Sequence, residues 1–156
     1  TGHIAAGLAQ EQVGNRETGS IPAEGSLIAV ATFSNARKWI KGERTIRSYE
    51  WTRYASLPGI RVNGGMGKLL KAFIEEVSPD DIMSYADLEW SEGKVYEQLG
   101  FVREGSKEPV SFIIDTDSWT RTVHKDPAPL PLTTSEKCFF TNFGSAKYRL
   151  KLTDYK

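Results

Sequence analysis

The stretch "NGGMGKLLKAFIEE" (63–76) places the strongest constraint on how this chain folds. Three glycines fall within four positions, Lys68 follows them, and apolar residues then recur at the spacing of one helical face. A strand that runs into such a turn and then into a helix leaves backbone N–H groups unpaired at the helix start. These donors and the positive end of the helix dipole favour an anion. The stretch therefore predicts either an anion-binding loop or a tight turn that starts a helix.

Two common nucleotide-binding loops do not match this stretch. A Walker A loop requires Ser or Thr after its lysine, and Leu69 stands there. A Rossmann fingerprint requires a third glycine three residues after the second, and that position holds Leu70. The residues alone therefore leave both interpretations of the loop open.

The rest of the chain alternates apolar strand-like runs with two helical patterns. We expect residues 1–25 to form a helix or an arm, 35–47 a polar turn, and 126–132 an extended proline-rich segment. Helices are expected from Lys68 to the Ser-Pro-Asp at 78–80 and within 91–100, where Gly100 suits a left-handed cap. Strands are expected at 26–34, 48–56, 81–88, 101–105, 110–115, 137–143 and 147–152. This order predicts a mixed α/β sheet with helices packed on it.

Composition limits the classes of protein to which the chain can belong. With 156 residues, 39% of them hydrophobic, we expect one domain over 1–156, with a core at about 26–115 and a C-terminal extension at 116–156. The 20 basic and 20 acidic residues cancel, so no global field gathers polyanions. Cys138 is the only cysteine, which excludes an intramolecular disulfide and favours a reducing compartment.

With neither a membrane-spanning apolar run nor a signal-peptide layout, we expect a soluble, cytoplasmic protein without a membrane partner. Because residue 1 is Thr, an upstream segment is an open alternative.

A second motif, "KVYEQLGF" (94–101), follows the strand "DIMSYAD". In this layout the chain resembles the GNAT acyltransferase superfamily: "VNGGMGKLL" (62–70) is similar to its acyl-CoA pyrophosphate loop, and "KVYEQLGF" to its later "LYEKLGF" signature. The resemblance implies a mixed, mostly antiparallel twisted sheet flanked by helices, followed here by a strand-rich C-terminal extension. The chain departs from the pattern at Val62, where many members carry Gln or Arg; Arg61 is the adjacent basic residue.

The resemblance also implies a co-substrate, acetyl-CoA or a related acyl-CoA. Its pantetheine would lie along the backbone of "YASLPGIRV" (54–62). Its pyrophosphate would be held by the loop residues Arg61, Val62, Asn63, Gly64, Gly65, Met66, Gly67 and Lys68.

A narrower resemblance covers residues 26–115. This part is similar to phage-encoded GNAT-like proteins, including a module found beside or within mobile-element endonucleases. A looser similarity links "SYAD" (84–87) and the Gly93-x-x-Tyr96 helix to Mom-type DNA-modification proteins. It implies an alternative function: a nucleic-acid-associated accessory or DNA-modification domain, without classical acetyltransferase turnover.

Acyl transfer to an amine needs a proton donor for the departing thiolate and a base for the amine. Tyr96 stands where the superfamily often uses a phenol as that donor; the alternative is an aromatic packing residue. Asp87 ends a strand as a candidate base or amine-orienting group, and its alternative role is to cap a turn. Glu50 is a second candidate base on a strand, and its alternative role is a salt bridge with Arg47 or Arg53. The resemblance implies direct transfer without an acyl-enzyme.

Other reactive side chains do not form a recognisable pattern. His3 and His124 lie in poorly readable segments, Cys138 has an apolar context, and no spacing supports a metal site. The amine acceptor stays open among a small molecule, a protein amine and an exocyclic base amine in DNA, and a homodimer is an open alternative.

Residues 37–53 combine positive charge with aromatic rings. This composition is expected either of a nucleic-acid contact or of a solvated hairpin anchored by Trp. The basic residues are Arg37, Lys38, Lys41, Arg44, Arg47 and Arg53, with Trp39, Tyr49 and Trp51 between them.

Overall fold

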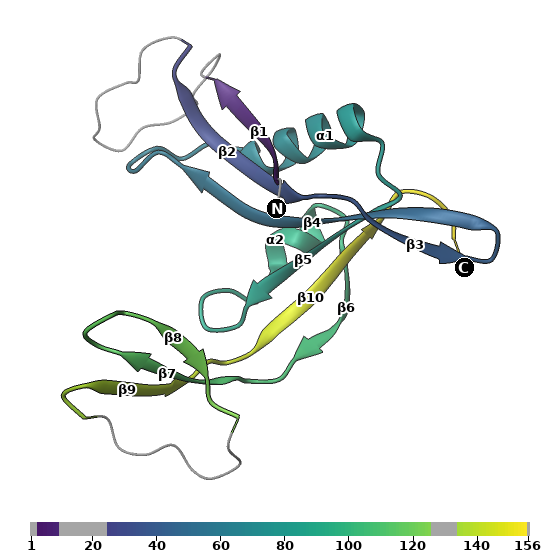
Figure 1. The fold of residues 1–156 in the computed structure, drawn as a ribbon. Coiled ribbons are helices and arrows are strands. Elements are labelled where there is room, and N and C mark those ends of the chain that lie inside the picture. Colours follow the sequence, from purple (N-terminus) through teal and green to yellow (C-terminus); the bar gives the residue numbers. More distant parts are fainter. Residues whose placement is uncertain (1–2, 10–24, 126–133, 156) are drawn as a thin grey trace. The chain divides into compact units, whose positions relative to one another are not determined.

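The computed structural model describes residues 3–9, 25–125 and 134–155, which form two compact units (Figure 1). The first unit consists of Thr1–Ser84, Leu99–Phe101 and Arg149–Lys156, and the second of Tyr85–Gln98 and Val102–Tyr148. The two units therefore interleave along the sequence. The expectation of a single domain with a core at about 26–115 stays a prediction.

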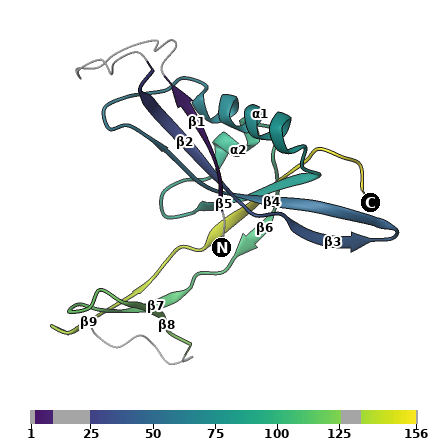
Figure 2. The same cartoon turned by 45° about the horizontal axis from the view of Figure 1, so that its top comes forward.

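The first unit is built on a mostly antiparallel sheet (Figures 1 and 2). Strand β1 (His3–Ala9) pairs antiparallel with β2 (Leu27–Ser34), which pairs antiparallel with β4 (Arg44–Ser56). The start of β5 (Asp81–Asp87) lies parallel to β4. Strand β3 (Arg37–Lys41) forms a hairpin with the first half of β4.

Helix α1 (Gly65–Val77) covers this sheet with one apolar face. Its side chains Leu69, Leu70 and Phe73 are buried, and the Phe73 ring stacks on Phe33 of β2 with ring centroids 3.7 Å apart. Burying each such side chain contributes about 1.5–3 kcal/mol. The helix ends where Ser78, at φ 49°, donates its N–H to the carbonyl of Ile74.

The second unit contains a short helix, one pair of neighbouring strands and a small separate sheet. Helix α2 (Lys94–Gln98) precedes β6 (Val102–Lys107), which neighbours β10 (Ser145–Lys151) in the strand order. The small sheet is antiparallel, with the order β8 (Arg121–Val123), β7 (Ser111–Asp115), β9 (Lys137–Thr141). Strands β5 and β10 each run from one unit into the other.

The mixed α/β class, with mostly antiparallel strands and few helices, confirms the coarse fold prediction. The two helices and seven expected strands are present, and α1 begins at Gly65 rather than Lys68. Among the described residues, no helix has both the length and the apolar character needed to cross a membrane.

Three local predictions need correction. Residues 35–47 do not form a polar turn but contain β3 and the start of β4, because a tight turn at Gly42, with φ 61°, closes a hairpin whose side chains are mostly exposed. Residues 3–9 form a strand, not a helix, since they pair along β2. Strand β8 was not expected at all. The proline-rich segment 126–132 lies outside the described residues.

Candidate functional site

The glycine-rich loop enters helix α1 through a left-handed residue. Gly64 has φ 69° and ψ 8°, and no side chain caps the helix. The N–H of Gly65 donates to the Val62 carbonyl at 3.1 Å, and that of Lys68 to the Gly64 carbonyl at 2.9 Å. Met66 and Gly67 complete the first turn, where backbone N–H groups have no acceptor within the helix itself. Two adjacent donors are therefore available at the positive end of the helix.

The charges around this loop also favour an anion. The first turn of α1 contains no acidic residue, so no carboxylate offsets the helix dipole. Lys68 and Arg61 flank the loop, and both side chains are exposed. An anion bound here would meet backbone donors and two cations at once.

The reason why glycine is present differs among the three glycines of the loop. Gly64 needs its left-handed backbone. A Cβ on Gly65 would lie 2.8 Å from Val62 Cγ1 and 2.9 Å from the Tyr54 hydroxyl, so packing excludes a side chain there. A Cβ on Gly67 would meet only Leu99 Cδ2, at 3.4 Å. Glycine inside a helix costs about 0.5–1 kcal/mol relative to alanine, and the fold does not explain that cost at Gly67.

The strand that precedes the loop is paired unequally on its two sides. Within the described residues, pairing of β4 with β5 covers Ser48 to Glu50, whereas its pairing with β2 continues to Ser56. A register shift beside Thr32 and Phe33, opposite Arg53 and Trp51, places an extra residue in β4 and bends the strand there. The segment expected to hold pantetheine, 54–62, thus comprises the end of β4 and the turn that leads into the loop.

Glu50, a candidate base, lies on β4 in the first unit and is ion-paired. Its Oε2 is 2.7 Å from Nη2 of Arg37, and 21% of its side chain is exposed. The expected partners, Arg47 and Arg53, are not used: Arg47 instead donates to the Tyr49 hydroxyl at 3.0 Å and to a carbonyl of α1. The salt-bridge interpretation therefore describes the geometry, with Arg37 as the partner.

Asp87, the other candidate base, is exposed at the end of β5 in the second unit. Its Oδ1 accepts the N–H of Glu89 at 3.0 Å, and its carbonyl accepts the N–H groups of Trp90 and Ser91. These bonds are those of a residue that caps a turn. The second carboxylate oxygen takes no part in these turn bonds.

Tyr96, the candidate acid, lies on α2 in the second unit with its side chain partly exposed. Its ring stacks on that of Tyr148, with centroids 5.4 Å apart and planes 29° apart. Its backbone N–H donates to the Gly93 carbonyl at 2.9 Å. Tyr96 and Asp87 share one unit, whereas Glu50 and the glycine-rich loop belong to the other.

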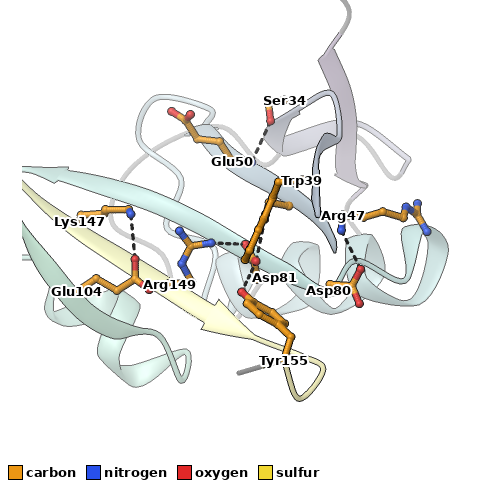
Figure 3. Close-up of polar contacts among 11 residues, drawn as sticks. Ser34, Trp39, Arg47, Glu50, Asp80, Asp81, Glu104, Lys147, Arg149 and Tyr155 are labelled. Atoms are coloured by element: carbon orange, nitrogen blue, oxygen red, sulfur yellow. Dashed lines mark hydrogen bonds and ion pairs between the residues drawn. The ribbon is translucent and has the colours of Figure 1, made fainter. Parts of the chain in front are cut away.

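Sequence reasoning missed a pair of buried carboxylates just after α1. Asp81, at 0% exposure, accepts hydrogen bonds from Arg149 at 2.6 Å, from Ser48 Oγ at 2.8 Å and from the Tyr155 hydroxyl (Figure 3). Burial and the neighbouring Asp81 carboxylate raise the pKa of Tyr155 to about 12. Trp39 extends the group by donating to Ser48 Oγ at 2.8 Å.

The carboxylate of the neighbouring Asp80 also accepts three hydrogen bonds. It accepts from Arg44 at 2.7 Å, from the Arg47 N–H at 2.8 Å and from Thr153 Oγ1 at 2.8 Å. These bonds, led by the Arg47 N–H, lower the pKa of Asp80 below its ordinary value. Adjacent aspartates before an apolar strand were the available signal, but their partners at 149–155 are too distant in sequence to be read from it.

The basic segment 37–53 is partly neutralised by these contacts. Arg37 and Arg44 are ion-paired with Glu50 and Asp80. Lys38 and Lys41 are exposed on β3 and take part in no ion pair among the described residues. Arg53 on β4 is likewise exposed and outside these ion pairs, so three of the six cations are placed to meet a ligand, two of them on β3.

Histidine, cysteine and metal chemistry gain no support from the described side chains. Cys138 is partly exposed, and the buried Nε2 of His124 has no hydrogen-bond partner in the described part of the chain. No group of three or more His, Cys, Asp or Glu side chains among the described residues is placed to hold a metal ion. His3 belongs to β1, and nothing further is assigned to it.

No model of a known protein family matches the sequence, and no curated protein matches it either.

Proposed function

We propose that this protein is an acyl-CoA-dependent N-acyltransferase of the GNAT type, which transfers the acyl group directly to an amine. The observation that carries the proposal is the start of α1, where a left-handed Gly64 leads into a first turn that contains Lys68, no acidic residue and no side-chain cap. Gly67 adds to this support because the fold does not require a glycine there. Close approach of a pyrophosphate to the backbone would explain its presence.

The proposed roles follow the order of the chain. The end of β4, from Tyr54 to Ser56, binds pantetheine through backbone groups, and the loop binds the pyrophosphate. The amine nitrogen attacks the thioester carbonyl, the C–S bond breaks, and Tyr96 donates its phenolic proton to the departing sulfur. Either Asp87 or Glu50 accepts the proton of the amine; Asp87 is the more accessible, because Arg37 already occupies Glu50.

Calorimetric titration with acetyl-CoA tests the proposal. The wild-type chain is expected to bind, and Gly67→Asp is expected to abolish binding, because a carboxylate would occupy the anion position. Ala72→Asp is the matched control: it adds the same charge to an exposed position of the same helix, beyond the first turn. The proposal is wrong if the wild-type chain does not bind, or if both variants bind as it does.

A second candidate is a nucleic-acid-associated accessory domain that uses β3. It is favoured by a strand whose five residues are all exposed, with Lys38 and Lys41 on either side of Trp39. Binding of single-stranded DNA should weaken steeply with salt and disappear in a Lys38→Gln/Lys41→Gln variant. Neutralising Arg44 would not be a clean test, because it pairs with Asp80. If the acceptor amine belongs to DNA, both candidates hold together.

A further inference from the structure

Tyr148 is a fully buried tyrosine on β10 that contacts the segment carrying Tyr96. Its side chain is 0% exposed, and its ring stacks on Tyr96. Its hydroxyl donates to the Glu92 carbonyl at 2.8 Å. Burial, followed by the nearby Glu97 carboxylate, raises the pKa of Tyr148, so the hydroxyl stays protonated and remains a donor at neutral pH.

Tyr148 also packs against Gly93, which directly follows Glu92, the residue whose carbonyl accepts the Tyr148 hydroxyl. Gly93 has φ 79°, and a Cβ there would lie 2.5 Å from Cε2 and 2.7 Å from the hydroxyl of Tyr148. A side chain at this position is therefore excluded twice, by the backbone conformation and by the aromatic ring. The close fit fixes the Glu92–Gly93 peptide against Tyr148.

This fixed peptide determines where α2 begins. The Gly93 carbonyl accepts the N–H of Tyr96 at 2.9 Å, closing the turn that leads into the helix. One end of Tyr96, its backbone, is thus held through Gly93, and the other end, its ring, is held by the stack. Both ends depend on the same buried side chain. The spacing Gly93-x-x-Tyr96 follows from this geometry.

We propose that Tyr148 is a positioning residue, which sets the backbone and the ring of Tyr96 so that its phenol is presented in one orientation. The inference rests on the proposed function for its chemical consequence, since the phenol must meet the sulfur of the leaving CoA. The phenolic proton passes to that sulfur as the C–S bond breaks, and solvent returns a proton to the phenolate. A misplaced phenol slows this step and leaves acyl-CoA binding unchanged, because binding depends on the other unit.

Amide hydrogen exchange tests the geometry without requiring activity. Tyr148→Phe keeps the ring and removes the bond to Glu92, so exchange at the Tyr96 N–H should become about tenfold faster, the equivalent of one weakened hydrogen bond. Tyr49→Phe is the matched control, since it removes another buried hydroxyl and should leave Tyr96 unchanged. Unchanged exchange at Tyr96 in Tyr148→Phe overturns the proposal.

A double-mutant cycle tests the chemical consequence, using acetyl-CoA and a panel of primary amines comprising an alkylamine, a polyamine and a lysine peptide. Tyr148→Phe should lower kcat about tenfold with an unchanged Kd for acetyl-CoA, and add no further loss to Tyr96→Phe. Equal kcat in Tyr148→Phe and wild type, or additive losses in the double variant, would overturn the positioning role. Absence of acetyl-CoA binding in the wild type refutes the proposed function instead, and the exchange experiment still decides the geometry.

Discussion

Polar groups at the start of α1 and just beyond its end differ in how they are hydrogen-bonded. At its start, the N–H groups of Met66 and Gly67 lie in the first turn, where the helix itself provides no acceptor and no side chain caps Gly64. Just beyond its end, Asp80 and Asp81 accept hydrogen bonds from side chains on either side of them in the sequence. Both regions belong to the first unit and are separated by one helix.

The difference separates stability from binding. A buried carboxylate whose oxygens are occupied has no capacity left for a ligand, so its loss should be felt in folding. Backbone donors without an acceptor add little to folding and are available to an anion. Substitutions at the two ends should therefore divide cleanly between changes in stability and changes in affinity.

The largest effect is expected from Asp81→Ala. This change leaves Arg149, with 15% of its side chain exposed, as a charge without its carboxylate, which costs about 3–5 kcal/mol of unfolding free energy. Denaturant unfolding measures the loss. Glu92→Ala, which breaks the exposed pair with Lys94, is the control and should leave the free energy of unfolding nearly unchanged. If Asp81→Ala lowers the unfolding free energy no more than the control does, the proposed difference between the two ends of α1 is wrong.

The next effect concerns Gly65→Ala. The added Cβ must displace Val62 and the Tyr54 hydroxyl, so we expect a loss of about 1–3 kcal/mol in unfolding free energy. Thermal unfolding with and without acetyl-CoA distinguishes this packing effect from a binding effect. If the variant is as stable as wild type, the loop can relax, and Gly65 joins Gly67 as a glycine that the fold does not require.

Gly67→Ala sharpens the comparison in the opposite direction. Replacing a helical glycine that has room for a methyl group should stabilise the fold by up to about 1 kcal/mol. The same methyl group would narrow the approach to the backbone, so affinity for acetyl-CoA should fall about tenfold, or about 1.4 kcal/mol. Calorimetry and denaturant unfolding on one sample measure both quantities. A variant that gains stability and binds as well as wild type would show that Gly67 has no role in binding.

The smallest effect is a pH dependence from Asp80. Its folded pKa lies below the ordinary value, so its contribution to stability is fully present at neutral pH and is lost as the pH falls below about 4. Unfolding free energy measured between neutral and acidic pH should decline in this window. Asp80→Asn should flatten that decline. Parallel curves for wild type and Asp80→Asn would contradict the assignment.

Local sequence patterns predicted the elements that have a strong apolar period. The face of α1 with Leu69, Leu70 and Phe73 is an example, because burial and helical spacing coincide there. Strand β3 escaped prediction because all five of its side chains are exposed and its ladder with β4 supplies the order. A polar hairpin of this kind has no apolar signature to read.

Some features of the candidate site could likewise be predicted from local sequence patterns, and others could not. A glycine-rich turn before α1 was predicted from the sequence, and the structure adds that Gly64 enters the helix in the left-handed conformation. The partner of Glu50 was not, because Arg37 lies across a hairpin that had been taken for a turn. The partners of Asp81 were out of reach for another reason: Arg149 and Tyr155 come from the far end of the sequence.

That last feature has a consequence for how the protein is made. Ser48 and Asp81 are synthesised long before Arg149 and Tyr155, so in a nascent chain the Asp81 carboxylate lacks two of its three hydrogen-bond donors. Asp81 cannot be buried with its hydrogen bonds satisfied until residues 149–155 have emerged from the ribosome and joined the first unit. Its final assembly therefore depends on long-range contacts, and a ribosome stalled before Arg149 should display an open, protease-sensitive intermediate.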